Sequence, residues 1–174
     1  MPMLKLIGAV LILFSGTMLG LWQAEQLSGR PRQIRQLVQV LQKLETEIVY
    51  GQTPLSEAIV HAAKGTAAPL SEMLATVAHE LRTNAGTSTY DIWQETTNRY
   101  WPFTHMKAAE KEIWLQFGQR VGASDREDQI KHIRLAMHQL KQEEDEARDE
   151  ATRFSKLWKS LGLLAAALIV ILMY

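Results

Sequence analysis

Apolar positions divide the chain into two uncharged ends and a patterned middle. Residues 6–22 and 161–174 are apolar runs without any charged residue. With its flanks, each run allows about 17 helical residues, or about 26 Å of hydrocarbon, which is short but sufficient to cross a bilayer core. We therefore predict an N-terminal transmembrane helix at 4–22, a soluble domain at 30–156 and a C-terminal transmembrane helix at 157–174.

The middle of the chain has the periodicity of helices. Apolar residues recur every three or four positions, as at Ile34, Leu37, Leu41 and Leu44, and no stretch alternates with the period of a strand. Prolines and capping residues predict six helix starts, at Pro31, Thr53-Pro54, Pro69, Ser88, Thr104 and Ser124. The fifth helix is expected to end at Gly118 or Gly122. The predicted fold is an all-α, six-helix antiparallel bundle between the two transmembrane helices.

The first and last helices of the soluble domain are expected to pair. Apolar positions of the last helix fit a heptad seam with one miss, at Glu144. Counted from Trp22 and from Trp158, the apolar stripes of the two helices come level. This predicts an antiparallel coiled-coil stalk reaching about 40 Å from the bilayer. Trp22 and Trp158 are the predicted membrane-interface anchors, because the amphipathic indole favours that level.

Basic residues set the predicted orientation. They gather on the inner side of both apolar ends, at Arg30, Arg32, Arg35, Arg148, Arg153, Lys156 and Lys159, whereas only Lys5 lies outside. The positive-inside rule then places the soluble domain in the cytoplasm. A cleaved signal peptide is the alternative for the first run. Its cleavage sites are poor, because Ala24 has Trp22 at −3, so retention as an anchor is favoured.

Composition excludes several kinds of function. The 174 residues carry 19 basic and 19 acidic side chains, so no nucleic-acid partner is expected. The absence of cysteine excludes disulfides, thiolate zinc sites and thiol catalysis. Only Asp128 and His132 share a helix face at metal-ligand spacing, and local sequence offers no further ligand. We expect no catalytic, metal or cofactor-binding residue, and a metal-dependent enzyme using this pair is the least favoured alternative.

Two features could bind partners. The acidic run Glu143, Glu144, Asp145 and Glu146 is either a solvated helix face or a docking patch for a basic partner. Gly16 and Gly20 form a Gly-xxx-Gly element that could pack against the second apolar end or another copy of the chain. Glycine is also simply frequent in membrane helices. Trp93, Trp101 and Trp114 are interpreted as core residues.

A longer motif carries a family resemblance. Leu44 to Ile59 reads Leu-Glu-Thr-Glu-Ile-Val-Tyr-Gly-Gln-Thr-Pro-Leu-Ser-Glu-Ala-Ile, a helix end that is acidic and aromatic, followed by Thr-Pro-Leu and a second helix. It resembles the stage III sporulation protein AB family of endospore-forming bacteria. The likeness extends from Leu4 through Arg30-Pro31-Arg32 to the terminal apolar run.

The resemblance implies a component of a channel between mother cell and forespore, in the mother-cell membrane. The family's soluble domain is similar to the cytoplasmic domain of platform proteins of type II secretion and type IV pilus systems. By this analogy the chain docks a cytoplasmic ATPase, resembling stage III sporulation protein AA, and contacts other channel subunits of the same operon. Platform proteins carry two such domains and this chain one, so a homo-oligomer is expected.

These expectations together describe a non-enzymatic, membrane-anchored scaffold. A helical tether or sensor without a secretion partner remains the alternative.

Overall fold

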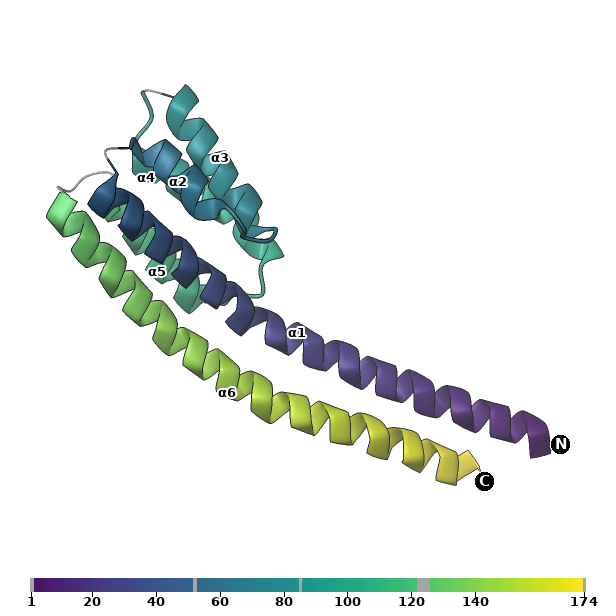
Figure 1. Cartoon of the computed structure of the whole chain (residues 1–174). Coiled ribbons are helices and arrows are strands. Elements are labelled where there is room, and N and C mark those ends of the chain that lie inside the picture. The colour runs from purple at the N-terminus through teal and green to yellow at the C-terminus, as the bar shows by residue number, and fades with distance from the viewer. Residues whose placement is uncertain (1, 52, 85, 122–125, 174) are drawn as a thin grey trace. The chain divides into compact units, whose positions relative to one another are not determined.

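Two long helices enclose four shorter ones along the chain. The computed structural model describes residues 2–51, 53–84, 86–121 and 126–173 (Figure 1). The long helices are α1 (Pro2–Tyr50) and α6 (Arg126–Met173), and the shorter ones are α2 (Leu55–Ala63), α3 (Leu70–Thr83), α4 (Thr89–Tyr100) and α5 (Ala108–Val121). A 3-10 turn, η1 (Trp101–Phe103), follows α4. Within these ranges there is no strand, so the all-α prediction with six helices is confirmed.

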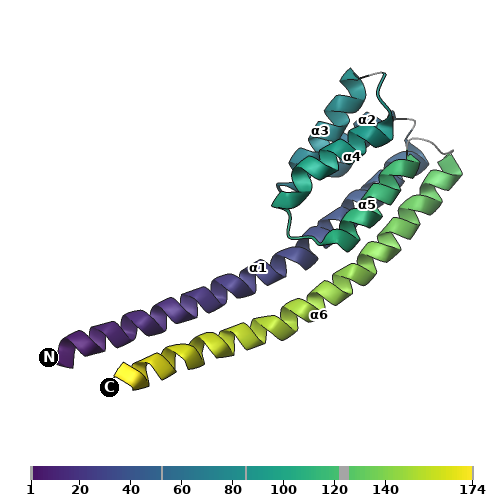
Figure 2. The same ribbon diagram turned by 180° about the vertical axis from the view of Figure 1, so that it is seen from behind.

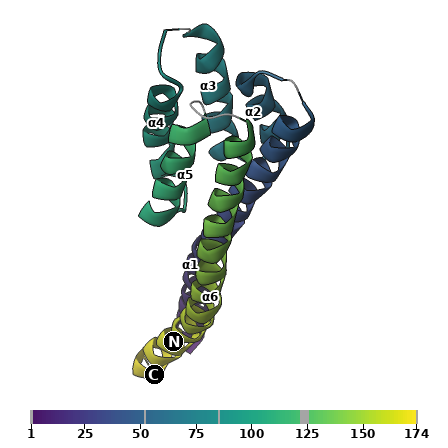
Figure 3. The same cartoon turned by 90° about the vertical axis from the view of Figure 1, so that its left-hand side faces the viewer.

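The chain forms two compact units. Arg30–Asp145 is the bundle unit, and Met1–Gly29 with Glu146–Tyr174 is the end unit. In the bundle unit α3 packs against both α2 and α4, and α4 packs against α5. Figure 3 shows this order, with α3 between α2 and α4. Among the residues whose side chains are described, none of the helices has the length and apolarity that crossing a membrane requires.

Within the bundle unit, α1 and α6 lie side by side and antiparallel (Figures 1 and 2). Arg35 of α1 pairs with Glu144 of α6 at 2.6 Å. Ten residues further along α1, Glu45 pairs at 2.7 Å with Arg134, which lies ten residues earlier in α6. The matched spacing fixes the antiparallel register of the two helices.

The core of the bundle unit follows the predicted apolar stripes. Ile34, Leu37, Leu41 and Leu44 are all buried along one side of α1. The centre of the core is aromatic: the rings of Trp93 and Trp114 lie 4.7 Å apart between centroids. Trp93 also donates its indole N–H to the carbonyl of Trp114 at 3.1 Å. The interpretation of the tryptophans as core residues is confirmed.

One predicted helix limit is wrong, and for another the structure excludes one of the two alternatives. Pro31 was expected to open a helix, because proline lacks the N–H of an interior residue. It lies inside α1, which continues on both sides and so tolerates the missing bond. Of the two predicted ends of the fifth helix, Gly118 is excluded, because α5 continues to Val121, the residue before Gly122. Its glycine serves packing instead, since a Cβ there would lie 2.1 Å from Cδ1 of Trp93.

A third limit differs because of local hydrogen bonding. Thr104 was expected to cap the fifth helix, but α5 begins only at Ala108. The Thr104 hydroxyl donates instead to the Trp101 carbonyl at 2.8 Å and so closes η1. The capping box predicted from Ser124 begins outside the described residues.

Candidate functional site

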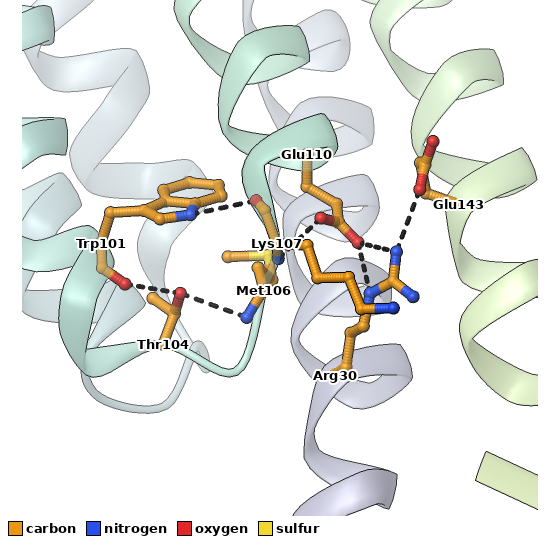
Figure 4. Close-up of polar contacts among 7 residues, drawn as sticks. All are labelled: Arg30, Trp101, Thr104, Met106, Lys107, Glu110 and Glu143. Atoms are coloured by element: carbon orange, nitrogen blue, oxygen red, sulfur yellow. Dashed lines mark hydrogen bonds and ion pairs between the residues drawn. The ribbon is translucent and has the colours of Figure 1, made fainter. Parts of the chain in front are cut away.

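A buried guanidinium joins three helices of the bundle unit. Arg30 of α1 places Nε and Nη2 each 2.7 Å from Oε1 of Glu110 in α5. Its Nη2 also lies 3.0 Å from Oε2 of Glu143 in α6 (Figure 4). The Arg30 side chain is 9% exposed, that of Glu110 0% and that of Glu143 22%. We call these residues the ion triad. Charges so removed from water must be paired, because an uncompensated buried charge costs several kcal/mol.

The ion triad also holds the connector, residues 101–107, that links α4 to α5. The second carboxylate oxygen of Glu110 accepts a hydrogen bond from the Lys107 backbone N–H at 2.8 Å. In a capping box, a glutamate in the first helical turn accepts a hydrogen bond from the backbone N–H of the N-cap residue, and Glu110 makes this bond. The Trp101 indole N–H donates to the Lys107 carbonyl at 3.3 Å, so both ends of the connector are tied together (Figure 4).

A further bond fixes the connector to α1. The backbone N–H of His105 donates to Oε1 of Gln33 at 2.7 Å, and Gln33 is itself buried. Gln33 lies one turn from Arg30, so the same stretch of α1 holds the connector at two points. The connector is therefore a defined surface element of the bundle unit.

The ion triad lies at the end of the bundle unit where the chain enters and leaves. Arg30 is its first residue, and Glu143 is close to its last, Asp145. We call this end the base. At the opposite end, the tip, Nε of Arg126 donates to the carbonyl of Ile48 at 2.7 Å and its Nη2 to that of Val49. These bonds satisfy carbonyls that the end of α1 leaves unpaired.

Comparison with known proteins identifies the family. The model of the family described as stage III sporulation protein AB matches residues 5–174. The chain belongs to the stage III sporulation protein AB family. The resemblance noted at Leu44 to Ile59 is thereby confirmed.

Two relatives support the family assignment over most of the chain. Stage III sporulation protein AB of Bacillus subtilis (strain 168) is 39% identical over 171 residues, which cover 98% of this chain and 99% of the relative. A solved structure of stage III sporulation protein AB matches with a TM-score of 0.66 at 38% identity. The matched region covers 71% of this chain and 97% of the solved chain.

In this member of the stage III sporulation protein AB family, the acidic run divides into two pairs. Glu143 and Glu144 turn toward α1, where their partners are Arg30 and Arg35. Asp145 and Glu146 are exposed. The miss in the heptad seam at Glu144 is explained by its ion pair, because its side chain is 16% exposed and still satisfied. The docking role of the run stays a prediction.

The structure adds no ligand to the Asp128 and His132 pair. Oδ1 of Asp128 accepts a hydrogen bond from Nζ of Lys131 at 2.9 Å. This bond and the Lys131 charge lower the pKa of the Asp128 carboxyl below its usual value. Among the described residues, no three or more histidines and carboxylates are grouped so as to hold a metal ion.

The predicted membrane residues cannot be placed in the same way. Trp22, Trp158, Gly16 and Gly20 lie within α1 and α6, but their burial and side-chain contacts are outside what the structure describes. Their roles stay predictions.

Sequence reasoning missed Glu110 and Gln33. Neither belongs to a motif, and both act across the fold. A signal for Glu110 was present, since it stands three residues after Lys107 at the start of a helical pattern, the position from which a glutamate caps a helix. Nothing in the sequence indicated that its partner is Arg30, 80 residues away.

Proposed function

We propose that the chain is a non-enzymatic, membrane-anchored scaffold of a sporulation channel between mother cell and forespore. In this proposal 6–22 and 161–174 cross the mother-cell membrane, and the bundle unit lies in the cytoplasm. There it docks an ATPase resembling stage III sporulation protein AA. The family assignment supports the sporulation role. The anchors rest on the uncharged apolar ends, and the orientation rests on the arginines and lysines inside them.

One observation carries the scaffold role: the ion triad joins α5 to both long helices at the base. A load applied to α6 reaches α1 and α5 as well, because Arg30 of α1 is bonded to Glu143 of α6 and to Glu110 of α5. Such a link suits a component that transmits a partner's movement rather than one that performs a reaction. Assembly into a homo-oligomer would supply the second domain that platform proteins have within one chain.

The exposed half of the acidic run is the proposed contact for a basic surface of the ATPase. Asp145 and Glu146 are exposed, whereas Glu143 and Glu144 are engaged with α1. A rim charge of this kind acts mainly on the rate of association and on its salt dependence.

The test is retention of the ATPase by the full chain in detergent-solubilised membranes. We expect Asp145→Lys with Glu146→Lys to lose retention. The matched control is Asp91→Lys with Glu95→Lys, which makes the same charge change on the exposed face of α4. Failure of the wild-type chain to retain the ATPase at low salt would contradict the docking proposal. Equal loss in both variants would show a general charge effect and contradict the assigned contact.

A further inference from the structure

We propose that two copies of this chain meet at one exposed face of the α1–α6 pair. The second copy is rotated by half a turn about an axis parallel to the two helices, so that its α6 lies against α1 of the first copy. This pairing rests on the proposed function in one respect, because two copies anchored in the same membrane have their bases on the same side.

The face consists of one exposed stripe from each long helix of the bundle unit. On α1 the exposed side chains recur every three or four residues, at Arg32, Arg35, Gln39, Gln42 and Thr46. On α6 they recur in the same way, at Lys131, Arg134, His138, Gln142 and Asp145. Each stripe therefore lies along one side of its helix. We call the two stripes together the outer face.

The two stripes border each other. Arg35 reaches from the α1 stripe to Glu144 of α6. Arg134 reaches from the α6 stripe to Glu45 of α1. Both arginine side chains face outward, at 55% and 68% exposure, whereas their carboxylate partners are 16% and 20% exposed. The shorter helix α5 packs elsewhere on the pair, because the ion triad that holds it lies on the far sides of α1 and α6 from the two stripes (Figure 4).

The two helices carry opposite charges at each end of the outer face. At the base, α1 contributes the cations Arg32 and Arg35, and α6 contributes the exposed carboxylate of Asp145. Towards the tip the signs are reversed, because Glu45 lies on α1 and Arg134 on α6. A surface with this arrangement of charges is complementary to a second copy of itself.

Other charged groups along the outer face do not disturb this pattern. Lys131 and Asp128 form a pair within α6 at 2.9 Å, so together they leave the sign of the tip unchanged. In the middle of the face, the register of the two helices places Gln39 of α1 near the level of His138 and Lys141 of α6. An amide therefore meets the lysine there instead of a second cation.

A half-turn about an axis parallel to the helices keeps every residue at its own level along the pair. Arg32 and Arg35 then face Asp145 of the second copy. Glu45 likewise faces Arg134 of the second copy, whose guanidinium has donors beyond those that its own Glu45 uses. Because a two-fold contact is isologous, each of these pairings forms twice.

The size of the outer face sets the expected strength of the contact. From Arg32 to Thr46 it is about 20 Å long, and it is two helices wide. This is smaller than the interfaces that hold soluble proteins together, and salt screens its exposed charges. We therefore expect pairing between copies held in one membrane or micelle, weakening as the salt concentration rises.

The test uses full-length chains with two different affinity tags, co-expressed and purified in detergent through one of the tags. In a pair of identical copies, Arg32→Glu opposes two acids at both contacts, and Asp145→Arg opposes two bases. In a mixed pair of these variants, one contact has both charges reversed and the other is unchanged, so both contacts are attractive. The amount of the second-tag chain that co-purifies is measured at low and at raised salt.

We expect co-purification to fall about tenfold for each variant paired with itself, and to return to the wild-type level in the mixture. The matched controls are Arg82→Glu on α3 and Asp91→Arg on α4, which change the same charges at exposed positions away from the outer face. Both should co-purify as the wild type does. Undiminished self-pairing of either test variant, or no recovery in the mixture, would overturn the inference.

The absence of cysteine allows the direction of pairing to be checked as well. Gln39→Cys in one copy and His138→Cys in the other should form a disulfide under mild oxidation, because the two positions lie within about 3 Å of one level. A disulfide between two Gln39→Cys copies, with none to His138→Cys, would indicate an inverted pairing and overturn the inference.

Two further outcomes separate this inference from the proposed function. Asp145 is also part of the proposed ATPase contact, but Arg32 is not, so copies joined through the ATPase would stay together in Arg32→Glu and overturn direct pairing. Wild-type chains that resist alkaline carbonate extraction and retain the ATPase, yet do not co-purify with each other, would overturn the inference alone. Extraction of the chain by carbonate would contradict the proposed anchors, and with them the shared orientation of the two copies.

Discussion

Arg30 and Glu110 form an ion pair at 2.7 Å in which the carboxylate is fully removed from solvent. Its partners belong to helices that are far apart in sequence, and Glu143 of a third helix completes the set. Removing one member of a buried pair leaves the other charge uncompensated, whereas replacing both removes the desolvation penalty as well. The ion triad is thus a point at which single and double substitutions have different consequences.

Arg30→Met should therefore lower the free energy of unfolding by about 3–5 kcal/mol, and Arg30→Met with Glu110→Met should recover much of that loss. Urea denaturation of the full chain in detergent, followed by circular dichroism, measures both. The control is Arg99→Met, which breaks a surface pair with Glu95 and a longer one with Glu80 and should cost less than about 1 kcal/mol. A double variant as unstable as the single one would contradict the pairing argument.

Gly118 is expected to tolerate no side chain. In Gly118→Ala the new Cβ meets the Trp93 indole, which is packed against Trp114 and cannot move away freely. Overpacking of this kind costs about 1–3 kcal/mol, and the near-ultraviolet circular dichroism of the indoles should change with it. Gly86→Ala is the matched control, because nothing lies within 4 Å of a Cβ at that position. Wild-type stability of Gly118→Ala would show that the indole relaxes.

The register of α1 and α6 predicts a charge-swap result. Glu144→Arg places a second cation against Arg35 and should destabilise the bundle unit more than Glu144→Gln does. Adding Arg35→Glu restores an opposite pair and should return part of the loss. The measurement is the interaction free energy between positions 35 and 144, obtained from the unfolding free energies of the single and double variants. A value of zero would argue against the pairing.

The pKa of Asp128 gives a prediction with a defined sign. Lys131 holds this pKa below its usual value, so the pair contributes stability above the ordinary aspartate pKa. The contribution is lost as pH falls through the lowered folded-state pKa. Lys131→Met should raise the pKa of Asp128, measured by NMR titration of its carboxyl carbon, while Lys141→Met should leave it unchanged. An unaltered Asp128 pKa in Lys131→Met would contradict the assigned cause.

The cytoplasmic placement proposed for the bundle unit predicts that it is protected from external protease. Protease added to intact cells should spare residues 30–156, and permeabilised cells should lose them. The arginines and lysines inside the apolar ends are the physical reason. Digestion of these residues in intact cells would contradict the predicted orientation.

Much of the fold could be predicted from the sequence because the signals for a helix lie within a few residues of one another. The stripe from Ile34 to Leu44 and the capping hydroxyl of Ser88, which accepts from the Tyr90 N–H, depend on neighbours two to four residues away. The start at Thr104 was misplaced because its hydroxyl closes η1 through the Trp101 carbonyl, and the start at Pro31 was misplaced because α1 continues through the proline.

The candidate site was the harder part. In the sequence, Arg30 was interpreted as a membrane-flanking cation and Glu143 as a member of an acidic run. In the fold, both belong to the ion triad. A charge in sequence does not reveal whether its partner lies one turn or 80 residues away. The same holds for Gln33, whose role depends on a backbone N–H in the connector.

The pairing of the first helix with late segments also has a consequence for biosynthesis. As the chain leaves the ribosome, α1 emerges before everything it binds: Glu110 follows Arg30 by 80 residues, Arg134 follows Glu45 by 89, and Glu144 follows Arg35 by 109. Contacts of α3 with α2 and with α4 can form early, but the bonds of α1 to α5 and α6 form only when those later helices are made. The protein should therefore fold more slowly than its helical content suggests, and its nascent α1 is the segment that a chaperone would need to shield.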